Sequence, residues 1–254
     1  MLTLHFREYG EGKPMVILHG LFGSSDNWQS LAQRFASFYR VFCIDLRNHG
    51  RSPWHNDHSY DAMVDDVYAF IKEQELSEII LLGHSMGGKV AMHFAQNYPH
   101  LLNKLVVADM GVKAYPMHHQ HILEGIHALH LDKITARSEA EETLKLHVEN
   151  DGIRQFLLKN LYWIEKGKLA WRMNVVVLER EMPKILSALP NGECWTPTLF
   201  LRGELSNYIL TEDFEGIEAA FPDATIETIP NAGHWLHAEQ PELFFDAVMG
   251  FCLR

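Results

Sequence analysis

The chain has 254 residues, of which 47% are hydrophobic and 22% charged, and its formal net charge is -11. This composition is ordinary for a globular protein, so it excludes a fibrous repeat and a disordered chain. The 22 Lys and Arg residues are scattered along the sequence, which argues against nucleic acid as a partner.

Short apolar runs rich in Val, Ile and Leu alternate with segments of helical spacing, which predicts parallel βαβ units in one doubly wound sheet. Few polar residues interrupt these runs, as expected for strands that helices cover on both faces. A last strand precedes a helix that begins at Pro241. The predicted strands are "MVILHG" at 15–20, "VFCIDL" at 41–46, "EIILLGHS" at 78–85, "KLVVADM" at 104–110, "TPTLFLRG" at 196–203 and "ATIETIP" at 224–230.

Almost ninety residues separate the strand that ends at Asp109 from the one that starts at Thr198, which is far more than a crossover helix needs. We expect a helical cap over the carboxyl edge of the sheet at about 113–192, with the core formed by 1–112 and 193–254. No Gly/Ser linker separates the two, so 1–254 should form a single domain. Helical spacing marks 121–134, 138–149, 151–165 and 174–186.

Three cysteines, Cys43, Cys194 and Cys252, lie in apolar surroundings without a CxxC spacing, which favours buried thiols over disulfides or zinc ligands. The first ten residues lack the pattern of a secretion signal, and no apolar run approaches eighteen residues. We therefore expect a cytoplasmic protein without a membrane span. The sequence makes no prediction of its oligomeric state.

Ser85, in "LLGHSMGGKV", stands between a predicted strand and a predicted helix. A serine at such a sharp turn is exposed in a strained backbone, and Gly83 and Gly87 are required where strand and helix cross. The Met86 N–H then lies at a helix N-terminus, where it can donate to an oxyanion. An incidental serine in a glycine-rich loop is the alternative, but the complete GxxxxGK[ST] motif of a phosphate cradle is absent.

A serine nucleophile needs a base on another loop at the same edge of the sheet. "IPNAGHWLHAEQP" supplies His234, directly after Gly233 and before the last helix. His237 is the rival, although its place near that helix favours a capping or packing role.

The second oxyanion donor is expected in the loop after an early strand, where "MVILHGLFGSSDNW" has the required form. The Leu21 N–H is the candidate, with Phe22 as the runner-up. His19 precedes this loop, and we expect it to orient the loop through hydrogen bonds instead of acting as a base.

The motifs "HGLFGS", "DLRNHGRS", "GHSMGG" and "NAGHW" resemble the α/β-hydrolase superfamily, in its order and over nearly the whole chain. Within it, "WRMN" and "PNAGHWLHAEQP" are most similar to YbfF-type bacterial esterases and their relatives called abhydrolase domain-containing protein 11. The resemblance implies hydrolysis of carboxylic esters or acyl-CoA thioesters without a cofactor. Carbon–carbon hydrolysis, perhydrolysis or a non-catalytic ligand receptor on the same fold remain alternatives.

The acid that orients the histidine is less evident, because the family's commonest place for it, shortly after Gly203, holds Leu205 and Ser206. Asp109, at the end of the preceding strand, is at the family's alternative site and is our prediction. Glu204 and Asp213 are the other candidates.

The cap should also supply an apolar pocket for the acyl group. Phe22, Trp163 and Trp171 are candidate lining residues, although each could instead pack within the protein.

The stretch "MHHQHILEGIHALHLDKI" places His127 and His130 three residues apart, but no further ligand completes a metal site, so we predict no metal. The predicted partner is a small-molecule ester or thioester.

Overall fold

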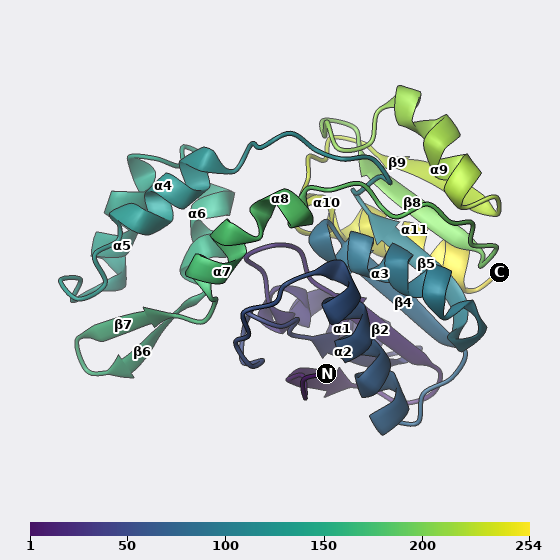
Figure 1. Ribbon diagram of the computed structural model, residues 1–254, viewed down its shortest axis with the longest axis horizontal. Coiled ribbons are helices and arrows are strands. Elements are labelled where there is room, and N and C mark those ends of the chain that lie inside the picture. The colour runs from purple at the N-terminus through teal and green to yellow at the C-terminus, as the bar shows by residue number, and fades with distance from the viewer.

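The computed structural model describes residues 1–254 and contains a seven-stranded sheet with helices on both faces (Figure 1). The strand order is β1-β3-β2-β4-β5-β8-β9, and every neighbouring pair is parallel except β1 with β3. This is the predicted α/β-hydrolase fold. The antiparallel edge strand β1 was not predicted from the sequence. The strands are β1 (Phe6–Tyr9), β2 (Pro14–Leu18), β3 (Arg40–Ile44), β4 (Ile79–His84), β5 (Leu102–Ala108), β8 (Thr198–Gly203) and β9 (Ala224–Ile229).

Alternate residues of the strands face two separate apolar layers. Val16 and Leu18 of β2 belong to the larger cluster, which includes residues of α2, α3 and α9, whereas Met15 and Ile17 belong to the cluster with α1, α10 and α11. Burial on both faces explains why the strand sequences are continuously apolar. These helices are α1 (Gln29–Phe35), α2 (Tyr60–Glu73), α3 (Met86–Asn97), α9 (Phe214–Ala220), α10 (Leu236–Glu239) and α11 (Pro241–Cys252), and the short 3₁₀ helices are Ser25–Trp28, Pro99–Leu101 and Thr211–Asp213.

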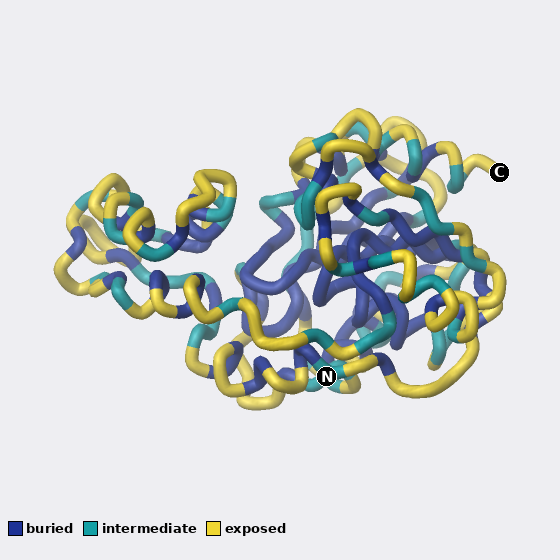
Figure 2. The backbone as a smooth tube through the Cα atoms, turned by 90° about the horizontal axis from the view of Figure 1, so that it is seen from above, coloured by how far each residue is buried: buried dark blue, intermediate teal, exposed yellow.

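The segment between β5 and β8, called the cap segment below and defined as residues 113–192, extends beside the sheet as a lobe (Figure 1). Its inward-facing side carries buried residues, and its outer turns are exposed (Figure 2). Its elements are α4 (Gln120–Ala128), α5 (Arg137–Lys145), α6 (Asp151–Leu158), β6 (Leu161–Glu165), β7 (Lys168–Trp171), α7 (Val175–Arg180) and α8 (Met182–Ile185).

The helices predicted over 121–134 and 138–149 end earlier, at Ala128 and Lys145, and the other two predictions for the cap segment were wrong. The helix predicted over 151–165 ends at Leu158, and Leu161–Glu165 instead pairs with Lys168–Trp171 as an antiparallel hairpin. The aromatic and β-branched residues of "LYWIE" favour a strand, and Gly167, with φ of 81°, makes the turn between β6 and β7. The predicted helix 174–186 is divided into α7 and α8, with Pro183 in the first turn of the second helix.

One buried lysine ties both ends of the cap segment to the core. Lys89 of α3 is fully buried, and its Nζ donates to the carbonyl oxygen of Lys113, at 2.8 Å, and to that of Ser187. Burial lowers the pKa of Lys89 to about 8. The helix that follows Ser85 therefore also holds the two chain crossings into and out of the cap segment.

All three cysteines are free, and Cys43 and Cys194 are buried as expected, whereas Cys252 is half-buried near the chain end. None of the helices combines the length and apolarity that crossing a bilayer requires.

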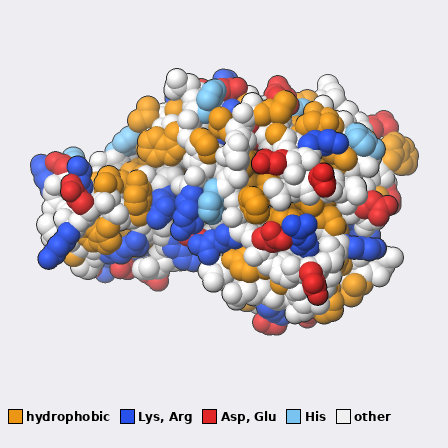
Figure 3. Space-filling model, turned by 90° about the horizontal axis from the view of Figure 1, so that it is seen from below, with side chains coloured by type: hydrophobic (Ala, Val, Ile, Leu, Met, Phe, Trp, Pro, Cys, Tyr) orange, Lys and Arg blue, Asp and Glu red, His pale blue; other side chains and the backbone are white.

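On the face shown in Figure 3, Lys and Arg side chains gather where the lobe meets the rest of the molecule, while apolar side chains lie over both parts.

Candidate active site

Ser85 lies at the turn between β4 and α3, with φ of 53° and ψ of -120°. A non-glycine residue rarely adopts this strained conformation, which the surrounding contacts must enforce. A Cβ on Gly83 would collide with the carbonyl of Gly87, and one on Gly87 would lie 2.5 Å from the Leu18 and His19 oxygens. The glycines therefore allow α3 to pack against the strands directly after the serine, as the sequence predicted.

His234 lies in the loop between β9 and α10 and reaches Ser85 across 149 residues of sequence. The Ser85 hydroxyl donates to its Nε2 at 2.9 Å. The His84 Nε2–H donates to the His234 carbonyl at 2.8 Å, which fixes the backbone of the loop. His237 instead stacks on Trp28, with ring centroids 4.4 Å apart, so the structure gives the rival histidine a packing position.

Asp109 follows β5 and lies beside the other ring nitrogen of His234. The Nδ1–H of His234 donates to Asp109 Oδ2 at 2.7 Å. His84 and Ala108, the last residues of β4 and β5, are paired, and Ala108 is paired with Leu201 near the end of β8, which explains how the groups that follow these strands meet. Asp109 also has a left-handed backbone, with φ of 49°.

Neither rival carboxylate faces the histidine. Glu204 Oε2 accepts from the Asn231 N–H at 2.8 Å, and Asp213 Oδ2 accepts from the Leu210 N–H at 2.7 Å and pairs with Lys113. Both side chains are thus committed to local loop structure.

Burial acts on both members of the Asp109–His234 pair. It raises the pKa of Asp109 to about 7, against the hydrogen bonds from Ser206 and Gly203 that favour the carboxylate. It lowers the pKa of His234 to about 3, with His118 contributing in the same direction. Since a dry environment disfavours both charged forms, the neutral imidazole is favoured, and this is the form that can accept a proton from Ser85.

The loop after β2 brings backbone N–H groups close to Ser85. A Cβ on Gly20 would lie 3.1 Å from the Ser85 Cβ, so only glycine allows this approach. The Phe22 N–H donates to His49 Nε2 at 3.2 Å, whereas the Leu21 N–H donates to no group of the chain. The Met86 N–H belongs to the first turn of α3, where N–H groups lack helical partners.

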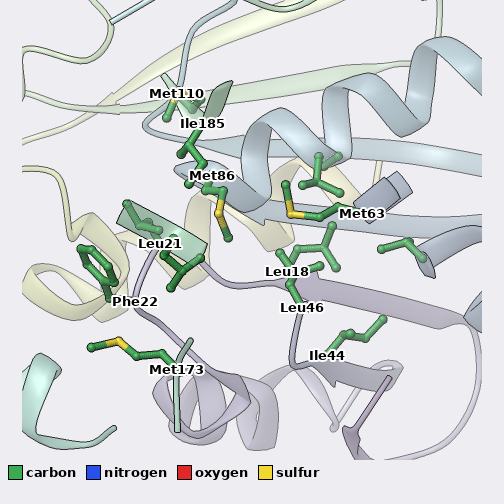
Figure 4. Packing of buried hydrophobic residues seen from close by; sticks show 14 of the residues in the cluster. Leu18, Leu21, Phe22, Ile44, Leu46, Met63, Met86, Met110, Met173 and Ile185 are labelled. Carbon is green, nitrogen blue, oxygen red and sulfur yellow. The ribbon is translucent and has the colours of Figure 1, made fainter. Parts of the chain in front are cut away.

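His19 fixes that loop through both ring nitrogens. Its Nδ1–H donates to the Gly20 carbonyl at 2.8 Å, and its Nε2 accepts from the Leu46 N–H at 3.0 Å. These bonds give His19 the orienting position that the sequence suggested. Figure 4 shows Leu21 and Met86 close together with Ile185 of α8, so side chains of both oxyanion candidates pack where the cap segment crosses the core.

A cavity of about 190 Å³ opens over Ser85 and His234. Core loops supply one wall and the cap segment supplies the other. Phe22 lies in the lining of this cavity, whereas Trp163 and Trp171 do not, because they belong to the β6–β7 hairpin at the outer part of the lobe (Figure 1). The apolar lining residues are Leu21, Phe22, Ile122, Ile153, Phe156, Leu157 and Trp235.

Residues 15–247 match the family model described as "Alpha/beta hydrolase family". The chain belongs to the α/β-hydrolase family. It is 40% identical over 246 residues to the mouse (Mus musculus) sn-1-specific diacylglycerol lipase ABHD11, covering 93% of this chain and 80% of that protein. It is 34% identical over 236 residues to Esterase YbfF of Escherichia coli (strain K12), covering 92% and 91% of the two chains.

Among solved structures, a marine microorganism esterase superposes on this α/β hydrolase with a TM-score of 0.96 and 41% sequence identity, covering 99% of this chain and all of the other. The relatives of this hydrolase thus carry the names of esterases and a lipase, which supports ester hydrolysis as the reaction. The expected resemblance to the YbfF and ABHD11 proteins is confirmed.

Two side chains beside Asp109 and His234 of this α/β hydrolase, those of Ser206 and Tyr208, were not predicted from the sequence. The Ser206 hydroxyl donates to Asp109 Oδ2, and the Gly203 N–H donates to Oδ1 at 3.0 Å. The Tyr208 ring stacks on His234 with centroids 3.7 Å apart, and its hydroxyl donates to His118 Nε2. The signal for Ser206 was its position: it occupies the place after Gly203 where the family commonly has the acid.

Proposed function

We propose that the protein is a serine hydrolase that cleaves carboxylic esters through an acyl-enzyme on Ser85. One observation carries the proposal: Ser85, His234 and Asp109 form a continuous hydrogen-bonded chain, at 2.9 and 2.7 Å, beneath an apolar cavity. A nucleophile, a base and an orienting acid in this order are what acyl transfer requires.

In the first half-reaction, Ser85 Oγ attacks the ester carbonyl carbon while His234 Nε2 accepts its proton. The carbonyl oxygen becomes an oxyanion, and the N–H groups of Leu21 and Met86 are positioned to donate to it. The imidazolium then protonates the departing alcohol oxygen as the carbon–oxygen bond breaks, which leaves the acyl group on Ser85.

In the second half-reaction, a water molecule attacks the acyl-enzyme, with His234 again accepting the proton. The carboxylic acid leaves and the serine hydroxyl is restored. The Asp109 carboxylate holds the Nδ1–H of His234 and stabilises the imidazolium in both halves, and the Ser206 hydroxyl holds the carboxylate.

The cap segment would bind the acyl chain and exclude water from the reaction. Ile122 of α4 and Ile153, Phe156 and Leu157 of α6 face the cavity, where they can contact an alkyl chain. Residues 113–192 therefore act, in this proposal, as the specificity-forming part of a single-domain enzyme. A cavity that the cap encloses favours single dispersed molecules with short to medium acyl chains.

The proposal is tested with a fluorophosphonate probe, which labels an activated serine covalently. We expect labelling of the wild type, no labelling of Ser85→Ala, and no labelling of His234→Ala at the same pH. An unlabelled wild type would instead favour a ligand receptor on the hydrolase fold.

A substrate panel then defines the class. Because the same attack can occur at a thioester carbonyl, the panel contains nitrophenyl esters of increasing chain length, acyl-CoA thioesters and diacylglycerol, the last because of the printed name of the mouse relative. The highest kcat/KM assigns the physiological type of bond.

A further inference from the structure

His119 lies at the N-terminal end of α4 and forms part of the cavity wall. It also lines a second, much smaller cavity of about 10 Å³ that it shares with Leu21, Ser85 and Met86. Its ring packs edge-on against Phe22, with centroids 6.4 Å apart. On its other side the ring packs against His118, with centroids 4.1 Å apart. His119 thus lies next to the place where the scissile carbonyl would lie.

Of the other histidines that line the cavity, His84, His118 and His234 already have hydrogen-bond partners, whereas His121 has none but is exposed to solvent. His84 donates to the His234 carbonyl, and His234 bonds both Ser85 and Asp109. The Nδ1–H of His118 donates to the Pro116 carbonyl, and its Nε2 accepts from Tyr208. The His119 ring has no hydrogen bond within the chain.

The two ring nitrogens of His119 differ in their surroundings. Nδ1 is buried and has no hydrogen-bond partner, whereas Nε2 is accessible to solvent. A buried N–H without an acceptor is rarer than an acceptor without a donor, so the ring proton belongs on Nε2. Burial, together with the neighbouring His118, lowers the pKa of His119 to about 3, which keeps the ring neutral.

We propose that His119 is a specificity-determining residue whose Nε2–H donates a hydrogen bond to a second acceptor oxygen of the substrate, close to the scissile carbonyl. The substrate class is an ester with an additional ether, carbonyl or hydroxyl oxygen near the reacting bond. A plain alkyl ester would displace water from this donor without replacing the bond, and an unpaired donor in an apolar site is costly. The inference rests on the proposed function only for the position of the scissile carbonyl at Ser85.

Matched substrate pairs test this donor, each pair differing by one methylene replaced with oxygen. Butyl butanoate against methoxyethyl butanoate places the oxygen on the alcohol side, and ethyl pentanoate against ethyl methoxypropanoate places it on the acyl side. For at least one pair, we expect the kcat/KM ratio of the oxygenated ester to the plain ester to be about fivefold higher in the wild type than in His119→Phe, the factor one neutral hydrogen bond supplies. The pair that responds identifies the side of the ester that His119 contacts.

His127→Phe is the matched control, because His127 lies on the same helix but is exposed, pairs with Glu179 and does not line the cavity. It should keep the wild-type ratios. His119→Gln, which retains a side-chain N–H donor, should restore part of the preference. If His119→Phe loses its circular dichroism spectrum, His119→Leu takes its place in the comparison.

Calorimetric binding of the same esters to Ser85→Ala and to Ser85→Ala/His119→Phe separates this inference from the proposed function. The oxygenated ester should bind with a Kd lower by the same factor only where His119 is present. If the wild type turns over no ester, the proposed function is wrong, and these Kd values still decide the role of His119. Equal ratios and equal Kd differences with and without His119, for both pairs, would overturn the inference.

Discussion

The core and the cap segment meet at the cavity, but the residues of the core are more deeply buried than those of the cap segment. Ten of the twelve residues of α3 are buried, whereas only Ala140 and Leu144 of the nine-residue α5 are. All residues of β4 are buried, but β6 is buried only at Leu161. The candidate catalytic residues belong to the densely packed core, and much of the cavity wall belongs to the cap segment.

From this difference we expect the core to determine the reaction rate and the cap segment to determine the substrate preference. Ser85 and Asp109 follow central strands whose registers are fixed by several hydrogen-bonded neighbours, so their positions are rigid. The cap residues Ile153 and Phe156 lie on the eight-residue helix α6, most of whose residues are not fully buried. Core substitutions should change the rate for every ester, whereas cap substitutions should change the preference among esters.

The largest expected effect is that of Ser85→Ala, which deletes the attacking oxygen at a turn where alanine fits. We expect ester hydrolysis to fall by about 10³-fold or more. Activity against a nitrophenyl ester, with circular dichroism as the control for folding, checks this. Retained turnover in a folded variant would remove Ser85 from the mechanism and, with it, the catalytic role of the core.

Asp109→Asn should have the next largest effect, because it keeps the shape of the side chain but loses the charge that orients and stabilises the imidazolium. We expect kcat to fall by about 10²- to 10⁴-fold for short and long acyl chains alike. Glu204→Gln and Asp213→Asn are the controls, measured in the same kcat assay. A near-normal rate in Asp109→Asn with a collapse in either control would transfer the role of the acid.

Ser206→Ala should move the pH dependence. Burial raises the pKa of Asp109, and the hydrogen bond from the Ser206 hydroxyl lowers it. Removing that hydroxyl should therefore raise the pKa of Asp109 further above the ordinary range. The active form of the pair is the one that has lost the extra proton, so activity rises with pH. The acidic limb of kcat/KM in Ser206→Ala should lie at higher pH than in the wild type, by about one pH unit. An unmoved limb would mean that Ser206 only packs there.

Phe156→Ala sharpens the comparison from the side of the cap. Removing this ring from the cavity wall should leave kcat for a short acyl ester within about threefold of the wild type and raise KM for longer chains by about tenfold, by the loss of apolar contact. A chain-length series measures both constants. An equal fall in kcat for all chain lengths would contradict the division between core and cap.

The smallest effect is expected for Trp163→Ala. This side chain is 41% exposed on the outer hairpin and lies outside the cavity lining, so kcat/KM should stay within about twofold of the wild type over the chain-length series. A selective loss for long chains would indicate that the hairpin closes over bound substrate.

The sequence by itself determined the elements whose causes are local. The continuous apolar strands follow from burial on both faces, and the serine turn follows from the space that Gly83 and Gly87 leave for a crossing helix. His234, in a loop after the last strand, could also be predicted as the base from the sequence, because a serine nucleophile needs a base at the same edge of the sheet. The strands and the serine turn depend on residues within a few positions of one another, whereas the prediction of His234 also used the chemical requirement of Ser85 for a base.

Tertiary structure alone decided the features that join distant segments. Ser206 meets Asp109 across 97 residues, and its position after Gly203 was the one sequence signal for it. Tyr208 stacks on a histidine from another loop, and nothing near Tyr208 in sequence indicates that partner. The segment Leu161–Glu165 was predicted as helix from its apolar spacing, although its aromatic and β-branched residues favour a strand. Pairing with Lys168–Trp171, which satisfies its backbone hydrogen bonds, decides for the strand. For the same reason, only the assembled cap shows that Phe22 faces the cavity while Trp163 and Trp171 lie outside it.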